Sequence, residues 1–121
     1  MWKFYNANSK GNFVNDCVVR AISKAEKKTW NKTYEELSDI AQSEGVLFDD
    51  VEFVENYLDG KYKRTCHYSK TVGEFAKEFP DGTYLVTMQG HITVIENGVI
   101  YDTFDCSNRR MWCAWRVILE K

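Results

Sequence analysis

The sequence predicts an α+β fold, with helices in the first two-thirds of the chain packed on an antiparallel sheet in the last third. Up to about residue 80, apolar side chains recur at the spacing of a helix face. After Gly82 the pattern changes to runs rich in β-branched and aromatic residues, which favour strands. Asn97-Gly98 separates two such runs and is the strongest short-range signal for a β-hairpin. Segregation of helices and strands along a chain is typical of the α+β class.

The predicted helices are bounded by capping and turn residues, and the predicted strands by changes of hydrophobic period. The fourth helix opens with Thr71-Val72-Gly73-Glu74, which matches the capping-box pattern. The expected helices run from Asp16 to about Lys27, from Thr29 to Gly45, from Asp49 or Asp50 to Leu58, and from Thr71 to Phe79. The expected strands are 62–68, 83–88, 91–96, 99–104 and 111–119, and residues 2–6 form a short strand or pack on the core.

The length of 121 residues suits one domain, 1–121, around a single core. Hydrophobic residues make up 44% of the chain and aromatic residues 15%, which argues against disorder. The net charge of −2 provides no field that favours nucleic acid or an anionic membrane. The segment 1–6 lacks the apolar core of a signal peptide, and no apolar run is long enough to span a bilayer. We therefore expect a cytoplasmic protein that binds neither nucleic acid nor membranes.

The cysteines at positions 17, 66, 106 and 113 are expected to be free thiols rather than two disulfides, because disulfides are rare in a reducing compartment. A zinc site made from Cys66, His67, Cys106 and Cys113 is the alternative. The chain contains no C-x2-C pair, so the spacing fits no usual zinc pattern. We predict no metal and no cofactor.

Cys17 is the first candidate functional residue, because it follows the expected N-cap Asp16 at the first position of an apolar helix. Free backbone N–H groups and the positive end of the helix dipole favour an anion at that place. The pKa of a thiol is lower at a helix N-terminus, so a larger fraction of the cysteine is present as thiolate. Cys17 is therefore either a nucleophile or a small buried side chain.

The hairpin supplies a possible partner for Cys17. With a two-residue loop at Asn97-Gly98, His91 and Asp102 lie on one face of the sheet, diagonal to one another and within reach of a hydrogen bond. Asp105 is expected to point to the opposite face unless a bulge intervenes. The other face of the hairpin is expected to be core and carries Ile92, Val94, Val99 and Tyr101.

A helix packed on this sheet can direct Cys17 toward His91. In that arrangement Cys17 is the nucleophile, His91 the base and Asp102 the group that orients the imidazole. The backbone N–H of Cys17 and a side-chain amide from Asn12 or Asn15 are the candidates for the oxyanion hole.

These residues resemble the papain-like cysteine peptidase superfamily, most closely its small C39-like branch of bacteria and phages. The resemblance rests on Asn15-Asp16-Cys17 opening an apolar helix, on Gly90-His91 at the head of a strand, and on Asp102-Thr103-Phe104 at the end of the next strand. It implies a papain-like cysteine hydrolase fold with a Cys-His-Asp triad, in which the aromatic residue covers the catalytic pair. The oxyanion glutamine of the family usually lies six residues before the cysteine, where this chain has Gly11.

The function that the resemblance implies is that of a thiol protease, a peptidase or isopeptidase that forms an acyl-enzyme with a peptide or protein substrate. The same triad also suits an amidase, a deamidase or a transglutaminase-like acyl transfer. A third interpretation is a non-catalytic binding or inhibitory protein on a papain-like scaffold, of phage or mobile-element origin. Cell-wall hydrolysis in the manner of NlpC/P60 or CHAP domains is a further alternative.

Two other charged residues lie near the candidate triad in the sequence. Arg20, one turn after Cys17, has three interpretations: it lowers the thiol pKa, binds a substrate carboxylate, or bonds a carboxylate within the fold. We favour the last. Asp105 is expected to pair with Arg109 or Arg110 in a surface turn. Three of the four tryptophans are expected to be core or cleft walls, since the basic stripe of a nucleic-acid platform is missing; they are Trp30, Trp112 and Trp115.

Overall fold

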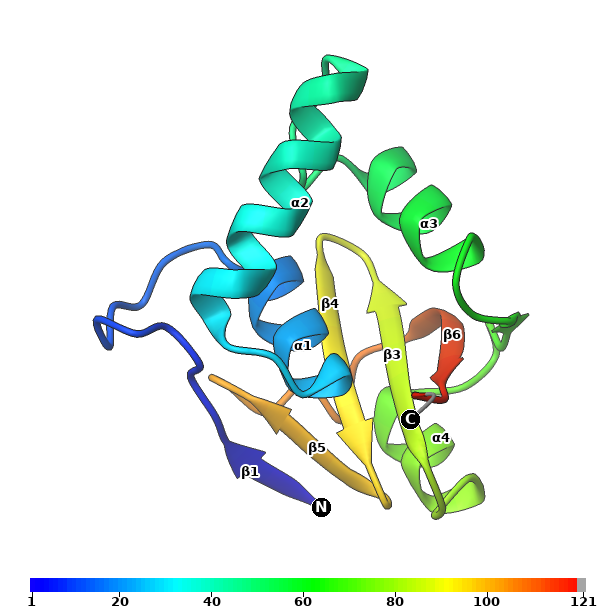
Figure 1. Cartoon of the computed structure of the whole chain (residues 1–121). Helices are drawn as coiled ribbons and strands as arrows, with labels where there is room; N and C mark the ends of the chain where they lie inside the picture. Colours follow the sequence, from blue (N-terminus) through cyan, green and yellow to red (C-terminus); the bar gives the residue numbers. More distant parts are fainter. Residues whose placement is uncertain (120–121) are drawn as a thin grey trace.

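The computed structural model describes residues 1–119 as four helices and a six-stranded mixed sheet, which confirms the α+β class (Figure 1). Along the chain the elements are β1 (Trp2–Phe4), α1 (Cys17–Glu26), α2 (Trp30–Glu44), α3 (Val51–Asp59), β2 (Arg64–Cys66), α4 (Val72–Glu78), β3 (Thr83–Met88), β4 (His91–Glu96), β5 (Val99–Asp102) and β6 (Met111–Val117). Within residues 1–119, none of the helices combines the length and apolar character that crossing a membrane requires.

The sheet has the strand order β1-β5-β4-β3-β6-β2. The prediction of an antiparallel sheet confined to the last third of the chain is wrong, because the sheet is mixed and includes two earlier strands. The strand β1 pairs parallel to β5, and β2 pairs antiparallel to β6. Both lie within the segments 2–6 and 62–68, where strands are expected, but each is three residues long and lies at an edge of the sheet, where a neighbouring strand offers free N–H and C=O groups. Such short pairings leave little periodic pattern in a sequence.

The β4–β5 hairpin has the predicted register. Glu96 pairs with Val99 across a two-residue loop. Asn97 and Gly98 have φ angles of 50° and 78°, so both adopt the left-handed conformation that a type I′ turn requires. The hairpin therefore places alternate residues of β4 and β5 on the faces that the sequence predicts.

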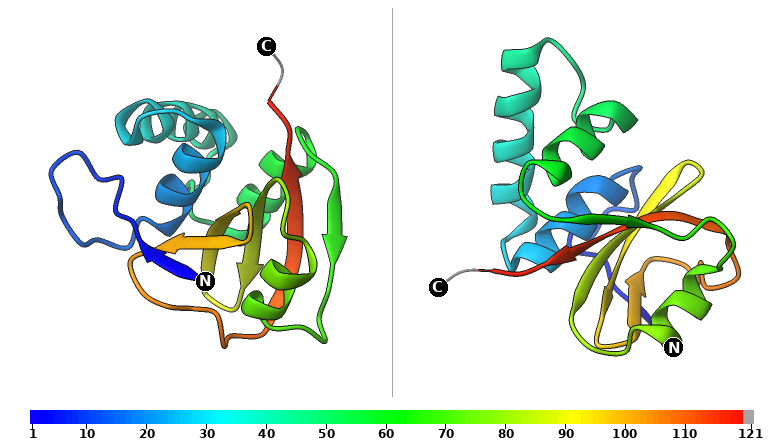
Figure 2. Two further views of the ribbon diagram at one scale, coloured as in Figure 1. Left: turned by 90° about the horizontal axis from the view of Figure 1, so that it is seen from below. Right: turned by 90° about the vertical axis from the view of Figure 1, so that its right-hand side faces the viewer.

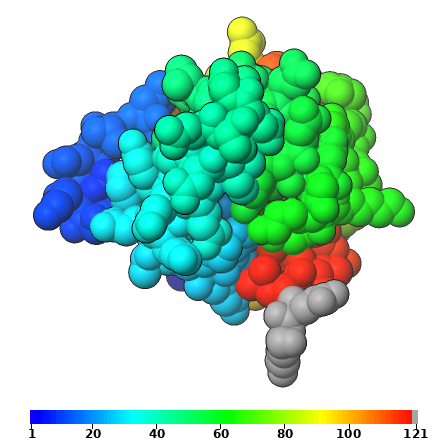
Figure 3. Space-filling model, turned by 45° about the horizontal axis from the view of Figure 1, so that its top comes forward, coloured from blue at the N-terminus to red at the C-terminus, as the bar shows by residue number. Residues whose placement is uncertain are grey.

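Helices cover both faces of the sheet (Figure 2). On one face, Ile92 and Val94 of β4 pack in the same core as Val19 and Ile22 of α1. On the opposite face, Ile95 packs in a second core with residues of α4. The sheet face that carries His91 is therefore also buried over much of its length. The sequence alone predicts core only on the face with Ile92 and Val94. Figure 3 shows the segments of α2 and α3 lying side by side over much of one face of the molecule.

The signals at the helix ends have mixed outcomes. The Thr29 side chain accepts a hydrogen bond from the backbone N–H of Lys32, and Gly45 ends α2 in the left-handed conformation, as predicted. Asp50 caps α3, and both hydrogen bonds of the Thr71 capping box are present. Asp16 occupies the N-cap position of α1, but its side chain makes no capping bond, because other partners engage it.

The expectation of four free thiols is wrong, because Cys66 and Cys113 form a disulfide between β2 and β6. The two residues are direct partners in the antiparallel register of these strands. Cys17 and Cys106 are the free cysteines. The spacing along the chain did not indicate this pair, because the bond depends on a three-residue edge strand that the pattern only partly outlined.

Candidate active site

The structure brings Cys17, His91 and Asp102 together at the ends of three elements. Cys17 begins α1, His91 begins β4 and Asp102 ends β5. The Nε2 atom of His91 lies 2.6 Å from Oδ2 of Asp102. A carboxylate only accepts hydrogen bonds, so Nε2 carries the proton, and Nδ1 remains free to exchange a proton with a thiol. His91 and Asp102 are both buried, with 8% and 1% of their side-chain surface exposed.

The environment of Cys17 favours its thiolate. Burial raises the pKa of the thiol, but hydrogen bonding from the His91 ring, the Ile92 backbone N–H, and the charges of His91 and Arg20 outweigh this effect. The net pKa lies below its ordinary value. The position of Cys17 at the start of α1 acts in the same direction, because the helix dipole and the free backbone N–H groups of a first turn favour an anion.

His91 shows the complementary shift. Burial lowers the pKa of its ring, but the hydrogen bonds and charges of Asp102 and Cys17 raise the net value to about 9. Burial likewise raises the pKa of Asp102, while the hydrogen bond and charge of His91 lower it below its usual value. The three shifts together favour a thiolate beside an imidazolium that is held by an ionised carboxylate.

The raised pKa of His91 predicts a pH dependence of stability. A group whose folded-state pKa exceeds its ordinary value of 6.5 contributes stability fully below pH 6.5 and loses it as the pH rises through about 9. We expect the free-energy advantage of Cys17→Ala over the double variant Cys17→Ala, His91→Gln to shrink as the pH rises above 6.5, as measured by urea unfolding at several pH values, because the alanine removes the opposite proton linkage of the lowered Cys17 pKa. An advantage that stays constant from pH 6 to 9 would contradict the assignment.

A buried ionic network lies behind the triad. Arg20 forms an ion pair with Asp16 and, through its second Nη atom, donates to Oδ1 of Asp102 at 3.0 Å. The indole Nε1 of Trp30 donates to the other oxygen of Asp16 at 2.8 Å. The favoured interpretation of Arg20, a bond to a carboxylate within the fold, is confirmed. The network ties the helix that begins at Cys17 to the carboxylate that orients His91.

Asp102 has two further partners. The backbone N–H of Thr103 donates to Oδ1 at 2.7 Å, and the Cys106 thiol donates to Oδ2 at 3.8 Å. Burial and the charge of Asp102 raise the pKa of Cys106 to about 12. Cys106 therefore remains a thiol and is a hydrogen-bond donor rather than a nucleophile. Although His91, Asp102 and Cys106 have ligand atoms within 4.8 Å of one another, a metal requires the thiolate and would displace these hydrogen bonds.

Sequence reasoning missed Asp16, Cys106 and Trp30 as supports of the site. The pair of Asp16 and Arg20 has the i,i+4 spacing of a helical ion pair, and this signal was present. No local signal linked Arg20 to Asp102, because the two residues are 82 positions apart. Cys106 follows Asp102 by four residues, but outside regular structure this spacing predicts nothing.

Phe104 covers the outer side of the His91–Asp102 pair. Its ring centroid lies 4.8 Å from that of His91, while 42% of the residue remains exposed. Asp105 does not pair with an arginine as expected. Instead its carboxylate accepts a hydrogen bond from the backbone N–H of Ser107 at 3.0 Å and shapes the turn. Arg109 donates to the backbone carbonyl of Gln89.

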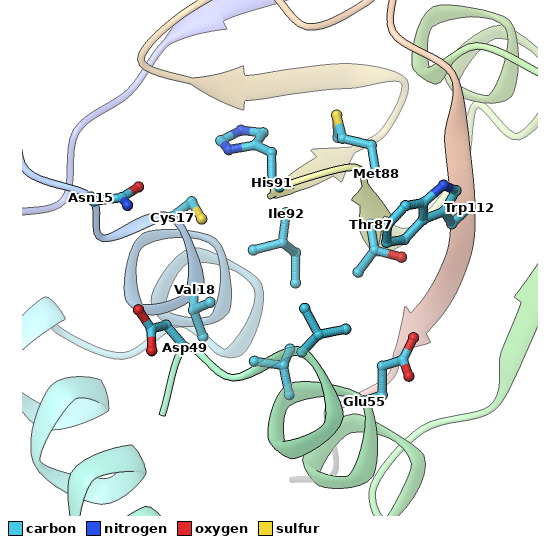
Figure 4. Close-up of a pocket in the computed structure, with 13 residues that line it drawn as sticks. Asn15, Cys17, Val18, Asp49, Glu55, Thr87, Met88, His91, Ile92 and Trp112 are labelled. Atoms are coloured by element: carbon cyan, nitrogen blue, oxygen red, sulfur yellow. The ribbon is translucent and has the colours of Figure 1, made fainter. Parts of the chain in front are cut away.

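A pocket of about 150 Å³ opens beside Cys17 and His91 (Figure 4). Its walls come from the start of α1, from α3, and from the ends of β3, β4 and β6 that meet there. Asn15 lies at the mouth beside Cys17, so it remains the oxyanion candidate. Asn12 is exposed and lies outside the set of residues within 1–119 that line the pocket. Trp112 forms a wall and Trp115 is fully buried, as predicted for these tryptophans.

Comparison with family models, with curated proteins and with solved structures found no match to this chain.

Proposed function

We propose that this protein is a small papain-like cysteine hydrolase that acts on peptide or isopeptide bonds. The observation that carries the proposal is the buried His91–Asp102 pair beside a cysteine at the start of a helix. The chain order of Cys17, His91 and Asp102, with the nucleophile helix packed on the strand that His91 begins, supports a papain-like fold.

The reaction that suits this geometry has two stages. The Cys17 thiolate attacks the carbonyl carbon, and the oxyanion receives hydrogen bonds from the Cys17 backbone N–H and the Asn15 amide. The His91 imidazolium donates its proton to the leaving amine as the C–N bond breaks, which leaves a thioester. His91 then takes a proton from water, the resulting hydroxide attacks the thioester, and Cys17 leaves as the thiolate. An amine in place of water gives acyl transfer.

Site-directed alkylation tests the proposed nucleophile. We expect iodoacetamide at neutral pH to modify Cys17 well before Cys106, because the pKa of Cys17 is lowered and that of Cys106 is raised. Peptide mapping by mass spectrometry of the protein with its disulfide intact measures both sites, and Cys17→Ala is the control that removes the fast phase. Equal labelling of the two thiols would overturn the proposal.

Incubation with a peptide library tests the reaction itself. We expect cleavage products in the wild type and none with Cys17→Ala. Products that appear only when an amine is added assign acyl transfer instead of hydrolysis. A wild-type protein that labels slowly at Cys17 and releases no product would support the non-catalytic interpretation of the scaffold.

A further inference from the structure

The pocket beside Cys17 combines an apolar wall with a negative rim. The apolar part comes from α1, α3, β3, β4 and β6, which surround a space large enough for one side chain. The apolar residues that line it are Val18, Val51, Val54, Met88, Ile92 and Trp112. A wall of this kind favours the methylene groups of a long side chain.

The charged groups of the pocket have one sign apart from His91. Asp49 and Glu55 line it, and no lysine or arginine among the described residues does. His91 is occupied by Asp102 on one side and faces Cys17 on the other. Apart from His91, which Asp102 and Cys17 already engage, the pocket therefore offers two carboxylates to a cation and no charged group to an anion.

Both carboxylates are available to a ligand. Asp49 has no hydrogen bond or ion pair with any residue in 1–119 that the structure describes. Glu55 has one, a contact of 3.7 Å with Nη1 of Arg64. Arg64 is held mainly by Asp59, through both Nε and the second Nη atom. The arginine thus has a better partner and does not neutralise Glu55 fully.

Different residues line the two ends of the pocket. Cys17 and His91 lie at one end, whereas Glu55 and the Trp112 indole lie at the other (Figure 4). A side chain that reaches from the reacting carbonyl to Glu55 passes along the valines of α3. The indole adds a surface that attracts a cation when the cation lies over the ring.

We propose that this pocket binds a lysine or arginine side chain of the substrate residue whose carbonyl carbon Cys17 attacks. The methylene stem lies against Val51, Val54 and Ile92, and the cationic head lies at Glu55 beside Trp112. The inference rests on the proposed hydrolase function and specifies the substrate class. Glu55 is then the residue that determines specificity, and acidic side chains at the same position are excluded by like charge.

Matched active-site-directed reagents test this specificity. We expect N-acetyl-lysyl chloromethyl ketone to alkylate Cys17 about fivefold to tenfold faster than the norleucyl reagent, and the glutamyl reagent to be slowest. Norleucine is the proper comparison, because it has a stem of similar length without the charge. Glu55→Gln is expected to bring the lysine-to-norleucine ratio toward one. The control Glu52→Gln removes an exposed carboxylate of the same helix outside the pocket and should keep the ratio.

A binding measurement separates failure of this inference from failure of the proposed function. In Cys17→Ala the pocket remains while alkylation is impossible, so a lysine peptide should shift the Trp112 indole NMR signal at lower concentration than the norleucine peptide. If iodoacetamide labels Cys17 rapidly but neither measurement favours lysine, the specificity is wrong and the hydrolase proposal stands. If Cys17 is unreactive while the lysine peptide binds preferentially, the pocket inference stands without the hydrolase.

Discussion

Replacing His91 with alanine is expected to lower kcat/KM for peptide hydrolysis by about 10²- to 10⁴-fold, the range usual for loss of a general acid–base group. His91 both takes the proton of Cys17 and returns it to the leaving amine, so one substitution removes two roles. The measurement is the cleavage rate of a peptide selected from the library, together with the rate of Cys17 alkylation at pH 7. We expect the alkylation to slow about tenfold as the thiol loses its partner.

The control is the other histidine of the chain. His67 packs its ring 5.2 Å from that of Phe75 and accepts or donates a hydrogen bond with Thr65, outside the pocket. His67→Ala should therefore leave both rates near the wild-type values while His91→Ala does not. Equal rates for the two variants would mean that the His91–Asp102 pair is a structural feature of the hairpin.

The sequence predicts those parts of the site whose geometry depends on residues that are close together along the chain. A two-residue Asn97-Gly98 loop has one register, and in a strand alternate residues share a face. His91 and Asp102 therefore had to lie on the same face once the loop was recognised, and their 2.6 Å contact follows from this register. The start of α1 at Cys17 is local in the same sense.

The remaining parts depend on contacts between distant segments. The approach of Cys17 to His91 requires α1 to pack on β4, and amphipathic pattern alone does not choose which strand a helix covers. Within α1, Arg20 is a polar residue among apolar neighbours. Its role in the site depends on Asp102 of β5, which lies 82 positions away in the sequence. The Cys66–Cys113 disulfide depends on a short edge strand. Asn12 is only five residues before Cys17, but the conformation of the loop before α1 leaves it exposed.

Replacing Arg20 with methionine is expected to lower the free energy of unfolding by about 3–5 kcal/mol, because it leaves two buried carboxylates without their shared cation. Asp16 and Asp102 are 6% and 1% exposed at their side chains, so water does not replace the guanidinium. Urea unfolding with an unchanged m-value measures the loss. The matched control is Lys32→Met, which breaks a 3.9 Å ion pair with Glu36 at an exposed position and should cost less than about 1 kcal/mol.

The same network offers an internal check on Arg20. If the cost of Arg20→Met arises from uncompensated charge, then removing the Asp16 carboxylate as well should return part of the lost stability. The double variant Asp16→Asn, Arg20→Met is therefore expected to be more stable than the sum of the two single losses predicts. Arg20→Lys should recover only part of the wild-type stability, since one ammonium cannot reproduce the fork that reaches both Asp16 and Asp102. Additive losses, or a cost for Arg20→Met no larger than for Lys32→Met, would show that the helix and the hairpin are joined by apolar packing alone.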